Sequence, residues 1–123
     1  MEKRMRLILI LGLVGGLGCW SSSTIFAAGD PEKGRPIYEK YCLLCHGPQG
    51  MGDGPQGKLM NPPASNFRSA ESKKKSDSDL LKTIQEGHSK TAMTGWENEL
   101  NKREMMDVLS YIRKLSGQGD KGL

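Results

Sequence analysis

Apolar side chains recur with a helical period near the end of the chain. The apolar positions between residues 108 and 115 repeat at i, i+3, i+4 and i+7, which is the spacing of a helix with one buried face. Just before them, Asn101 and Glu104 have the spacing of a capping box, flanked by Leu100 and Met105 as in a hydrophobic staple. This pattern predicts a terminal helix that packs against the rest of the fold.

Two earlier segments also have the marks of helices. Residues 79–87, DLLKTIQEG, place three aliphatic side chains on one side, follow the candidate cap residues 76–78 and end in a glycine. In residues 29–42, an aspartate and a proline resemble a cap and a first-turn proline. Pro36 lacks an amide donor, so we expect either a kinked first turn or a helix that begins at Pro36 and runs to Cys45.

The start of the chain has a different pattern. MEKRMR is basic, residues 7–14 (LILILGLV) are apolar, and small residues lead to SSSTIFAA, which is the layout of a secretory signal cut after Ala27 or Ala28. An uncleaved membrane anchor is a second interpretation, although the apolar run is shorter than the roughly 20 residues that a span needs. A lipoprotein signal is a third, because GLGC ends at Cys19.

Composition restricts the class of protein. The chain has 123 residues, which is enough for at most one small domain. Its net charge is +4. Loss of the signal removes three basic side chains and one acid, which lowers the charge to +2. We therefore expect no nucleic-acid partner. Two cysteines would remain, too few for the disulfide framework of an exported protein.

The stretch YCLLCHG holds these cysteines, Cys42 and Cys45, with His46 directly after them. A structural zinc site would need four ligands, and the only other histidine, His88, lies far along the chain. A redox dithiol would need a strand before the motif, and none is predicted. CxxCH is also the attachment motif of c-type haem: two cysteines one turn apart reach one edge of the porphyrin, and the histidine reaches the iron.

A second axial ligand would then be needed, usually Met or His. Met51 lies too close to His46 in sequence to reach the opposite face of the haem, and Met105 and Met106 are better explained by packing in the last helix. Spacing alone leaves three candidates, namely Met60, His88 and Met93.

From Gly29 to Gly117 the chain resembles a class I (mitochondrial-type) cytochrome c, and within that class the small bacterial monohaem group related to haem subunits of haem-copper oxidases. The resemblance rests on four stretches: GDPEKGRPIYEKYCLLCHG, the glycine-rich GMGDGP, AMTGW at residues 92–96, and MDVLSYIRKL at residues 106–115.

This resemblance implies an all-α fold, with three to four short helices and a long loop wrapped around one covalent haem c. It implies that Cys42 and Cys45 attach the haem, that His46 is the proximal iron ligand and that Met93 is the distal ligand. The family usually has proline after this methionine, but here Thr94 follows, so the ligand loop lacks that rigid residue.

The resemblance also implies two structural contacts. The first and last helices would cross at Gly34 and Tyr38, where the glycine permits close approach. A backbone carbonyl near Pro62 or Pro63 would accept a hydrogen bond from Nδ1 of His46 and orient the imidazole.

The segment 47–76 shows almost no periodicity and is rich in proline and glycine, so it predicts a loop of thirty residues, which is unusually long for a compact domain. A haem explains such a loop, because its apolar residues would pack against the macrocycle. Leu59, Met60 and Phe67 are the candidates for this wall.

The domain organisation follows: a signal segment over residues 1–28, a cytochrome c domain over residues 29–117 and a flexible tail over residues 118–123. The implied function is that of a periplasmic or otherwise extracytoplasmic one-electron carrier of a respiratory chain, and not of an enzyme. Its partners would be redox proteins such as a membrane oxidase, reductase or dehydrogenase, to which it could also be bound as a subunit. Membrane attachment would occur only through the N-terminal segment.

Two other functions stay open at this point. A haem enzyme or gas sensor would leave the sixth iron position open, and a haem-free CxxC dithiol oxidoreductase would use the two thiols directly. Five lysines, Lys73, Lys74, Lys75, Lys82 and Lys90, could dock an acidic partner, or they could simply belong to a solvated surface.

Overall fold

The computed structural model describes residues 29–119, so the expected signal segment lies outside the described residues. This part of the chain is helical, and its elements are α1 (Pro31–Tyr41), α2 (Leu43–His46), the 3-10 turn η1 (Gly57–Leu59), α3 (Ala70–Lys74), α4 (Asp77–Glu86) and α5 (Lys102–Leu115). Residues 29–119 contain no strand beyond an isolated bridge between Gly87 and Thr94. The all-α prediction is therefore confirmed, and no helix within the described range is long and apolar enough to cross a membrane.

Helix α1 begins where its cap residues predict. The side chain of Asp30 accepts a hydrogen bond from the Glu32 amide, and Pro31 occupies the first turn. Pro36 lies inside the helix, so the expectation that a helix begins at this proline and runs to Cys45 is wrong. Pro36 is exposed, and the helix continues past it to Tyr41 because its other face packs against α5.

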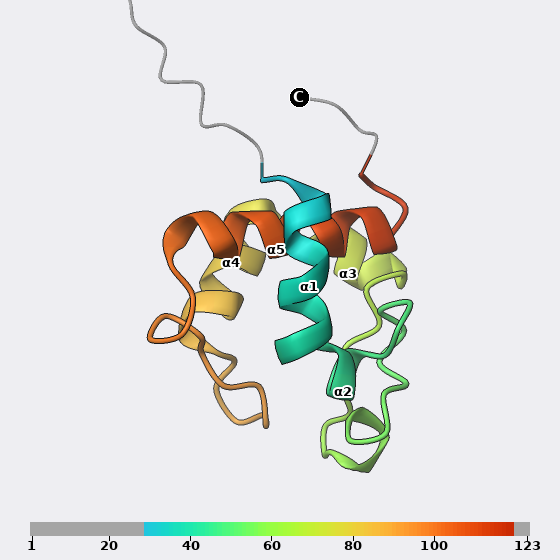
Figure 1. Ribbon diagram of the computed structural model, residues 1–123. Coiled ribbons are helices and arrows are strands. Elements are labelled where there is room, and N and C mark those ends of the chain that lie inside the picture. Colours follow the sequence, from blue (N-terminus) through green and yellow to red (C-terminus); the bar gives the residue numbers. More distant parts are fainter. Residues whose placement is uncertain (1–28, 120–123) are drawn as a thin grey trace, which may run out of the picture.

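Helices α1 and α5 cross in contact (Figure 1), and Gly34 is the point of closest approach. A Cβ atom on Gly34 would overlap the backbone carbonyl of Asp107 and lie 2.9 Å from Cα of Val108. One turn later, Tyr38 is fully buried, and its hydroxyl donates to the carbonyl of Gly47 at 2.6 Å. The predicted crossing at Gly34 and Tyr38 is confirmed.

The capping box predicted at Asn101 and Glu104 is present, and a second box starts α4, where the sequence predicted only a cap residue among positions 76–78. The side chain of Ser76 accepts from the Asp79 amide at the start of α4, and Asn101 accepts from the Glu104 amide at the start of α5. In each box the acidic side chain accepts in return from the cap amide. Gly87 ends α4, as the sequence predicts.

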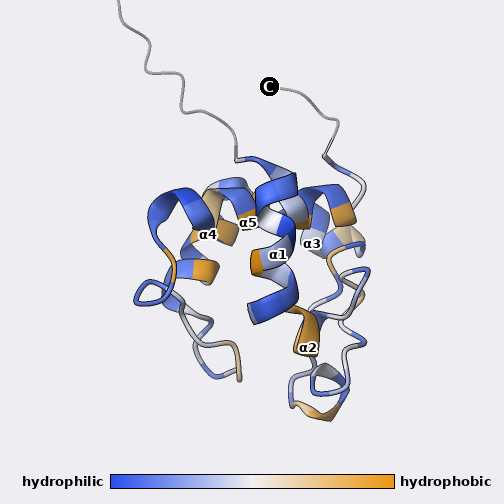
Figure 2. Ribbon diagram, in the orientation of Figure 1, coloured by the Kyte–Doolittle hydropathy of each residue, from blue (hydrophilic) through white to orange (hydrophobic). Residues whose placement is uncertain are grey.

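The core lies where α5 meets α1 and α4. Its buried members are one aromatic and six aliphatic or thioether side chains, Tyr38, Ile84, Leu100, Met105, Val108, Leu109 and Ile112. Figure 2 shows hydrophilic residues along most of the ribbon and hydrophobic residues over α2. The terminal helix therefore buries the face that its periodicity predicts.

The segment 47–76 is more ordered than its sequence predicts, because it contains both η1 and α3. Helix α3 is capped by Ser69, whose side chain accepts from the amide of Ser72. Arg68 fixes the same region by donating from Nε to the carbonyl of Leu115. These turns were missed because helices of three to five residues are too short to produce a periodic pattern.

Candidate haem site

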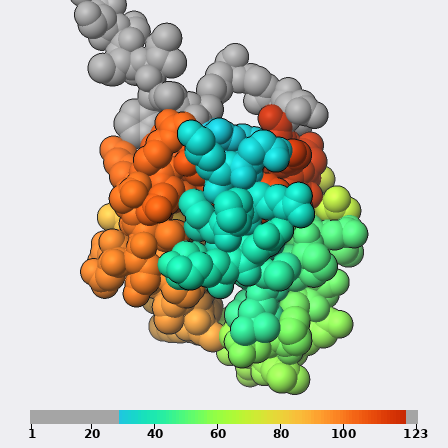
Figure 3. Space-filling model, viewed as in Figure 1, coloured from blue at the N-terminus to red at the C-terminus, as the bar shows by residue number. Residues whose placement is uncertain are grey.

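A cavity of about 340 Å³ is lined by two flanking segments, one that follows α2 and one that precedes α5. Figure 3 shows these two flanks in green and orange, on either side of α1. Much of the cavity lining is apolar, and α4, α5 and the loop between them contribute Leu80, Ile84, Trp96, Leu100, Val108 and Ile112. The four expected site residues, Cys42, Cys45, His46 and Met93, all line this one cavity.

The CxxCH motif forms a single helical turn at the edge of the cavity. The amides of Cys45 and His46 both point to the carbonyl of Cys42, at 3.2 and 2.9 Å. Gly47 ends the turn by donating from its amide to the carbonyl of Leu43. The two thiols therefore lie one turn apart, with the imidazole beside the second.

The glycine-rich loop after the motif packs directly against this turn. A Cβ atom on Gly57 would overlap the carbonyl oxygen of Cys45 and lie 2.8 Å from its carbon. The carbonyls at the end of the turn accept loop amides, from Gly52 to His46 and from Gly54 to Cys45. The loop thus satisfies backbone groups that a helix end would otherwise leave without partners.

His46 is oriented by two contacts. Its Nδ1 lies 3.2 Å from the carbonyl oxygen of Ser65, and its ring stacks on Phe67 with centroids 4.5 Å apart. A carbonyl oxygen only accepts, so Nδ1 carries the proton and Nε2 keeps a lone pair. The predicted hydrogen bond to a backbone carbonyl near Pro62 or Pro63 is present, and its acceptor is Ser65, two residues after Pro63.

Burial controls the charge of the motif. It lowers the pKa of His46, against the opposing effect of the hydrogen bond to Ser65, and so favours the neutral imidazole that binds metals. Burial, with a smaller effect of Cys45, raises the pKa of the Cys42 thiol to about 12. Both cysteines are free of disulfide bonds. A reactive dithiol needs a lowered thiol pKa, so these properties disfavour the dithiol interpretation.

The zinc interpretation has no ligand set in the described part of the chain. Among residues 29–119, no group of three or more His, Cys, Asp or Glu side chains could hold a metal ion. The cavity instead combines an apolar lining, two thiols and a neutral imidazole, which is a donor set that fits a covalently bound haem.

Met93 lies on the opposite flank, in a short hairpin that follows α4. Its amide donates to Oγ1 of Thr91 at 3.1 Å, and its carbonyl accepts from the amide of His88 at 3.0 Å. Further along, the amide of Trp96 donates to the carbonyl of Ile84. The hairpin is therefore held by hydrogen bonds on both sides of Met93, although Thr94 replaces the expected proline.

The other candidate ligands fall into two groups, those that line the cavity and those that do not. Met60 and His88 also line the cavity, whereas Met51 is 44% exposed and Met105 is buried in the core. Among the predicted wall residues, Met60 and Phe67 line the cavity. Leu59 is 86% exposed and does not, so that prediction is wrong; its place in the turn η1 directs it away from the cavity.

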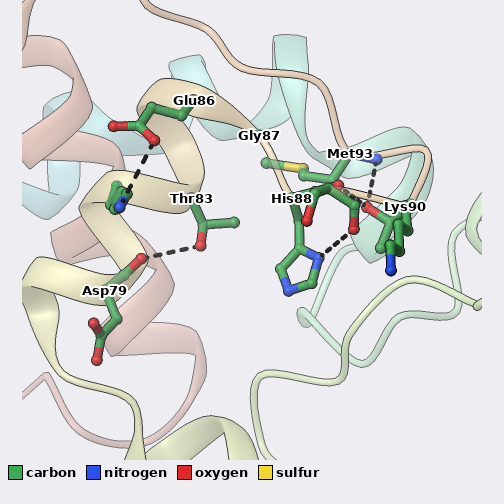
Figure 4. Close-up of a pocket in the computed structure, with 10 residues that line it drawn as sticks. Asp79, Thr83, Glu86, Gly87, His88, Lys90 and Met93 are labelled. Carbon is green, nitrogen blue, oxygen red and sulfur yellow. Dashed lines mark hydrogen bonds and ion pairs between the residues drawn. The ribbon is translucent and has the colours of Figure 1, made fainter.

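A second, open pocket lies outside the hairpin and shares Thr83, His88, Thr91 and Met93 with the cavity. Figure 4 shows this pocket, with His88 and Met93 next to each other. Two of the five lysines line it, and one of them, Lys82, pairs with Glu86 at 4.0 Å. Its polar rim contrasts with the apolar interior of the cavity.

Sequence reasoning missed two groups that position His46 and Met93, the expected ligands. Ser65 acts through its backbone carbonyl, which every residue has, so no side-chain signal exists for it. Thr91 acts through its hydroxyl, and its place two residues before Met93 was the only available signal.

Comparison with known proteins agrees with this geometry. The family model described as cytochrome c matches residues 31–116, and no curated protein sequence matches the chain significantly. Similar solved structures include a chain of the Kuenenia stuttgartiensis reducing HAO-like protein complex Kustc0457/Kustc0458, with 28% identity, a TM-score of 0.61 and 70% of this chain covered. The present chain spans only 42% of that protein.

A second similar structure is the KustC0563 c-type cytochrome, at 26% identity and a TM-score of 0.53. The alignment covers 69% of the present chain and 95% of that protein. The helical fold, the cavity with its CxxCH turn and the match over residues 31–116 lead to one conclusion. The chain belongs to the cytochrome c family and carries covalently bound haem c.

Proposed function

We propose that this protein is an extracytoplasmic one-electron carrier, with one haem c bonded by Cys42 and Cys45 and ligated by His46 and Met93. A haem-based role in electron transfer follows from membership of the family. The observation that carries the finer assignment is that all four residues line one largely apolar cavity, with the CxxCH turn on one flank and the methionine hairpin on the other.

The attachment of the haem is supported by the geometry of the turn. Cys42 and Cys45 are one helical turn apart, half-buried and not joined to each other, so both thiols are available for thioether bonds. A haem c held there supplies an iron that gains or loses one electron.

The proximal role of His46 rests on its surroundings. The Ser65 carbonyl holds the proton on Nδ1, and Phe67 limits rotation of the ring. Nε2 is then the nitrogen that would bind the iron, and the carbonyl makes the imidazole a stronger donor.

The distal role of Met93 closes the site. Histidine on one side and methionine on the other would fill both axial positions, which leaves no position for a substrate at the iron. This ligation also gives a higher potential than a pair of histidines, and both properties suit a carrier rather than an enzyme or a gas sensor.

The extracytoplasmic location is supported by the leader pattern of residues 1–28 and by the haem attachment itself, which bacteria carry out outside the cytoplasm.

The similarity to a chain of a reducing HAO-like complex also supports a more specific version of the function. In that version the carrier works as an electron-transfer subunit bound to a larger oxidoreductase.

The test is the visible spectrum of the protein made in a host that matures c-type cytochromes. We expect covalent haem, a six-coordinate low-spin iron and the weak far-red band of a methionine–iron bond. Haem without that band would contradict Met93, and a product without covalent haem would contradict the proposal as a whole. Slow carbon monoxide binding to the reduced protein would exclude the open-iron alternative.

A further inference from the structure

The methionine hairpin presents a second metal-binding side chain beside Met93. Gly87 pairs with Thr94 in an antiparallel bridge, which places His88 opposite Met93, and the amide of His88 donates to the carbonyl of Met93 at 3.0 Å. Opposite residues in antiparallel pairs send their side chains to the same face. Figure 4 shows the two side chains next to each other.

Both side chains face the haem cavity. His88 and Met93 line the inner cavity and also the open pocket outside it. His88 is exposed and Met93 is half-buried, so the histidine lies at the rim and the methionine lies deeper. Because the imidazole is exposed at its present position, moving it inward would break few buried contacts.

His88 already holds the tautomer of a ligand. Its Nδ1 lies 3.2 Å from the carbonyl oxygen of Ser89, and because that oxygen only accepts, Nδ1 carries a proton, which leaves Nε2 as the nitrogen with a lone pair in the neutral ring. His46 has the same arrangement with Ser65. The exposed face of the hairpin also carries Lys90, whose amine is a competing donor that any test must exclude.

We propose that His88 is a reserve distal ligand, which binds the haem iron through Nε2 when the sulfur of Met93 leaves it. The inference rests on the proposed His46 and Met93 ligation. In the exchange one iron–sulfur bond breaks and one iron–nitrogen bond to the neutral imidazole forms, so neither an electron nor a proton is transferred. The thioether is the softer donor and the imidazole the harder one, so ferric iron favours the exchange more than ferrous iron does.

The consequence is a site that stays closed after damage. Peroxide converts a methionine thioether to its sulfoxide with release of water, and in an ordinary carrier this would open the iron to small molecules. With His88 in reserve, the iron stays six-coordinate, and the potential falls toward that of a bis-histidine haem.

The test compares three variants with the wild-type protein. Met93→Ala should be low-spin, with the electron paramagnetic resonance spectrum of two histidine ligands and a lowered potential. Met93→Ala combined with His88→Ala should be high-spin and should bind carbon monoxide at least about tenfold faster, since no ligand has to be displaced. Met93→Ala combined with Lys90→Ala is the matched control and should keep the bis-histidine spectrum.

The outcomes separate the two proposals. Absence of the methionine band in the wild-type protein would contradict the proposed function. If the band is present but Met93→Ala is already high-spin, or if the Lys90 control loses the low-spin signal, the reserve role of His88 is wrong. Peroxide oxidation of the folded wild-type protein gives a second route and should yield the same bis-histidine spectrum without any substitution.

Discussion

Gly34 of α1 and Asp107 of α5 are in direct backbone contact, with no room for even one methyl group between them. The same aspartate accepts from the amide of Asp30 at 2.7 Å through its side chain, and Arg103 pairs with it at 3.2 Å. Asp107 therefore joins the start of the first helix to the last helix, and the core beneath the cavity depends on this crossing.

Gly34→Ala should destabilise the protein even though alanine favours helices. Overpacking at the crossing should cost about 3 kcal/mol of unfolding free energy, more than the roughly 1 kcal/mol that alanine contributes over glycine in a helix. Chemical denaturation measures the change. Lys33→Ala, on the exposed side of the same helix, is the control and should be nearly neutral; an equally stable Gly34→Ala protein would contradict the close packing.

Substitution of the cysteines should remove the haem bonds one at a time. Cys45→Ser should retain haem through the single thioether of Cys42, and the double variant with Cys42→Ser should lose all covalent haem. Mass spectrometry of the denatured protein distinguishes the cases. Haem that remains on the double variant would show attachment at another residue.

With Met93 as the proposed distal ligand, Thr91→Val should weaken the binding of its sulfur to the iron. The hydroxyl of Thr91 accepts from the Met93 amide and donates to the His88 carbonyl at 2.8 Å, and each hydrogen bond is worth about 1 kcal/mol. Loss of both bonds should therefore let added imidazole bind the ferric iron up to about thirtyfold more tightly. Thr91→Ser keeps the hydroxyl and should bind imidazole as the wild type does; equal affinities in all three proteins would contradict this role.

The capping box of α4 should stabilise the protein more when Asp79 is ionised than when it is protonated. Hydrogen bonds from the side chain and amide of Ser76 lower the pKa of Asp79 below its ordinary value of 3.8. Because the folded pKa is the lower one, this stability is fully present above about pH 4 and is lost as the pH falls through the folded pKa.

Ser76→Ala should therefore destabilise the protein at pH 7 by more than it does in strong acid. A carboxyl titration by nuclear magnetic resonance should show the pKa of Asp79 rising in the variant. A pH-independent difference in stability between the two proteins would indicate that the ionisation of Asp79 is not involved.

Export in a bacterial host should yield a mature protein that begins at Ala28 or Gly29. The basic start and the apolar run at residues 7–14 predict this cleavage. Intact mass and cell fractionation measure it. A lipid-modified Cys19, or an uncut chain in the membrane fraction, would favour one of the two alternative anchors.

The sequence predicts most where a side chain has a local task. Asp30, Ser76 and Asn101 cap helices through their own oxygens, and each was a candidate cap in the sequence, although residues 76–78 were left open and Pro36 was an alternative start for the first helix. The role of Gly34 was predicted from the family resemblance. The structure gives the reason for a glycine there, since a Cβ atom would overlap the backbone of Asp107.

Prediction failed where tertiary contacts decide. Pro36 would stop an isolated helix, but packing of α1 against α5 keeps the helix intact. Leu59 is apolar and yet exposed, and the sequence placed the carbonyl that contacts His46 only near Pro62 or Pro63, without identifying Ser65. The path of an aperiodic loop depends on its backbone hydrogen bonds, which leave no pattern in the side chains.

Both ends of the described chain pack on α5, with Gly29 against the backbone of Met106 and Gly119 against Lys114. Helix α2 and the neighbouring loop tips lie on the side away from these ends (Figure 1). A linker, an affinity tag or a fused domain at either end would therefore leave from the α5 side. A protein tethered to an electrode by its ends should keep its CxxCH turn turned away from the electrode surface and open to a partner in solution.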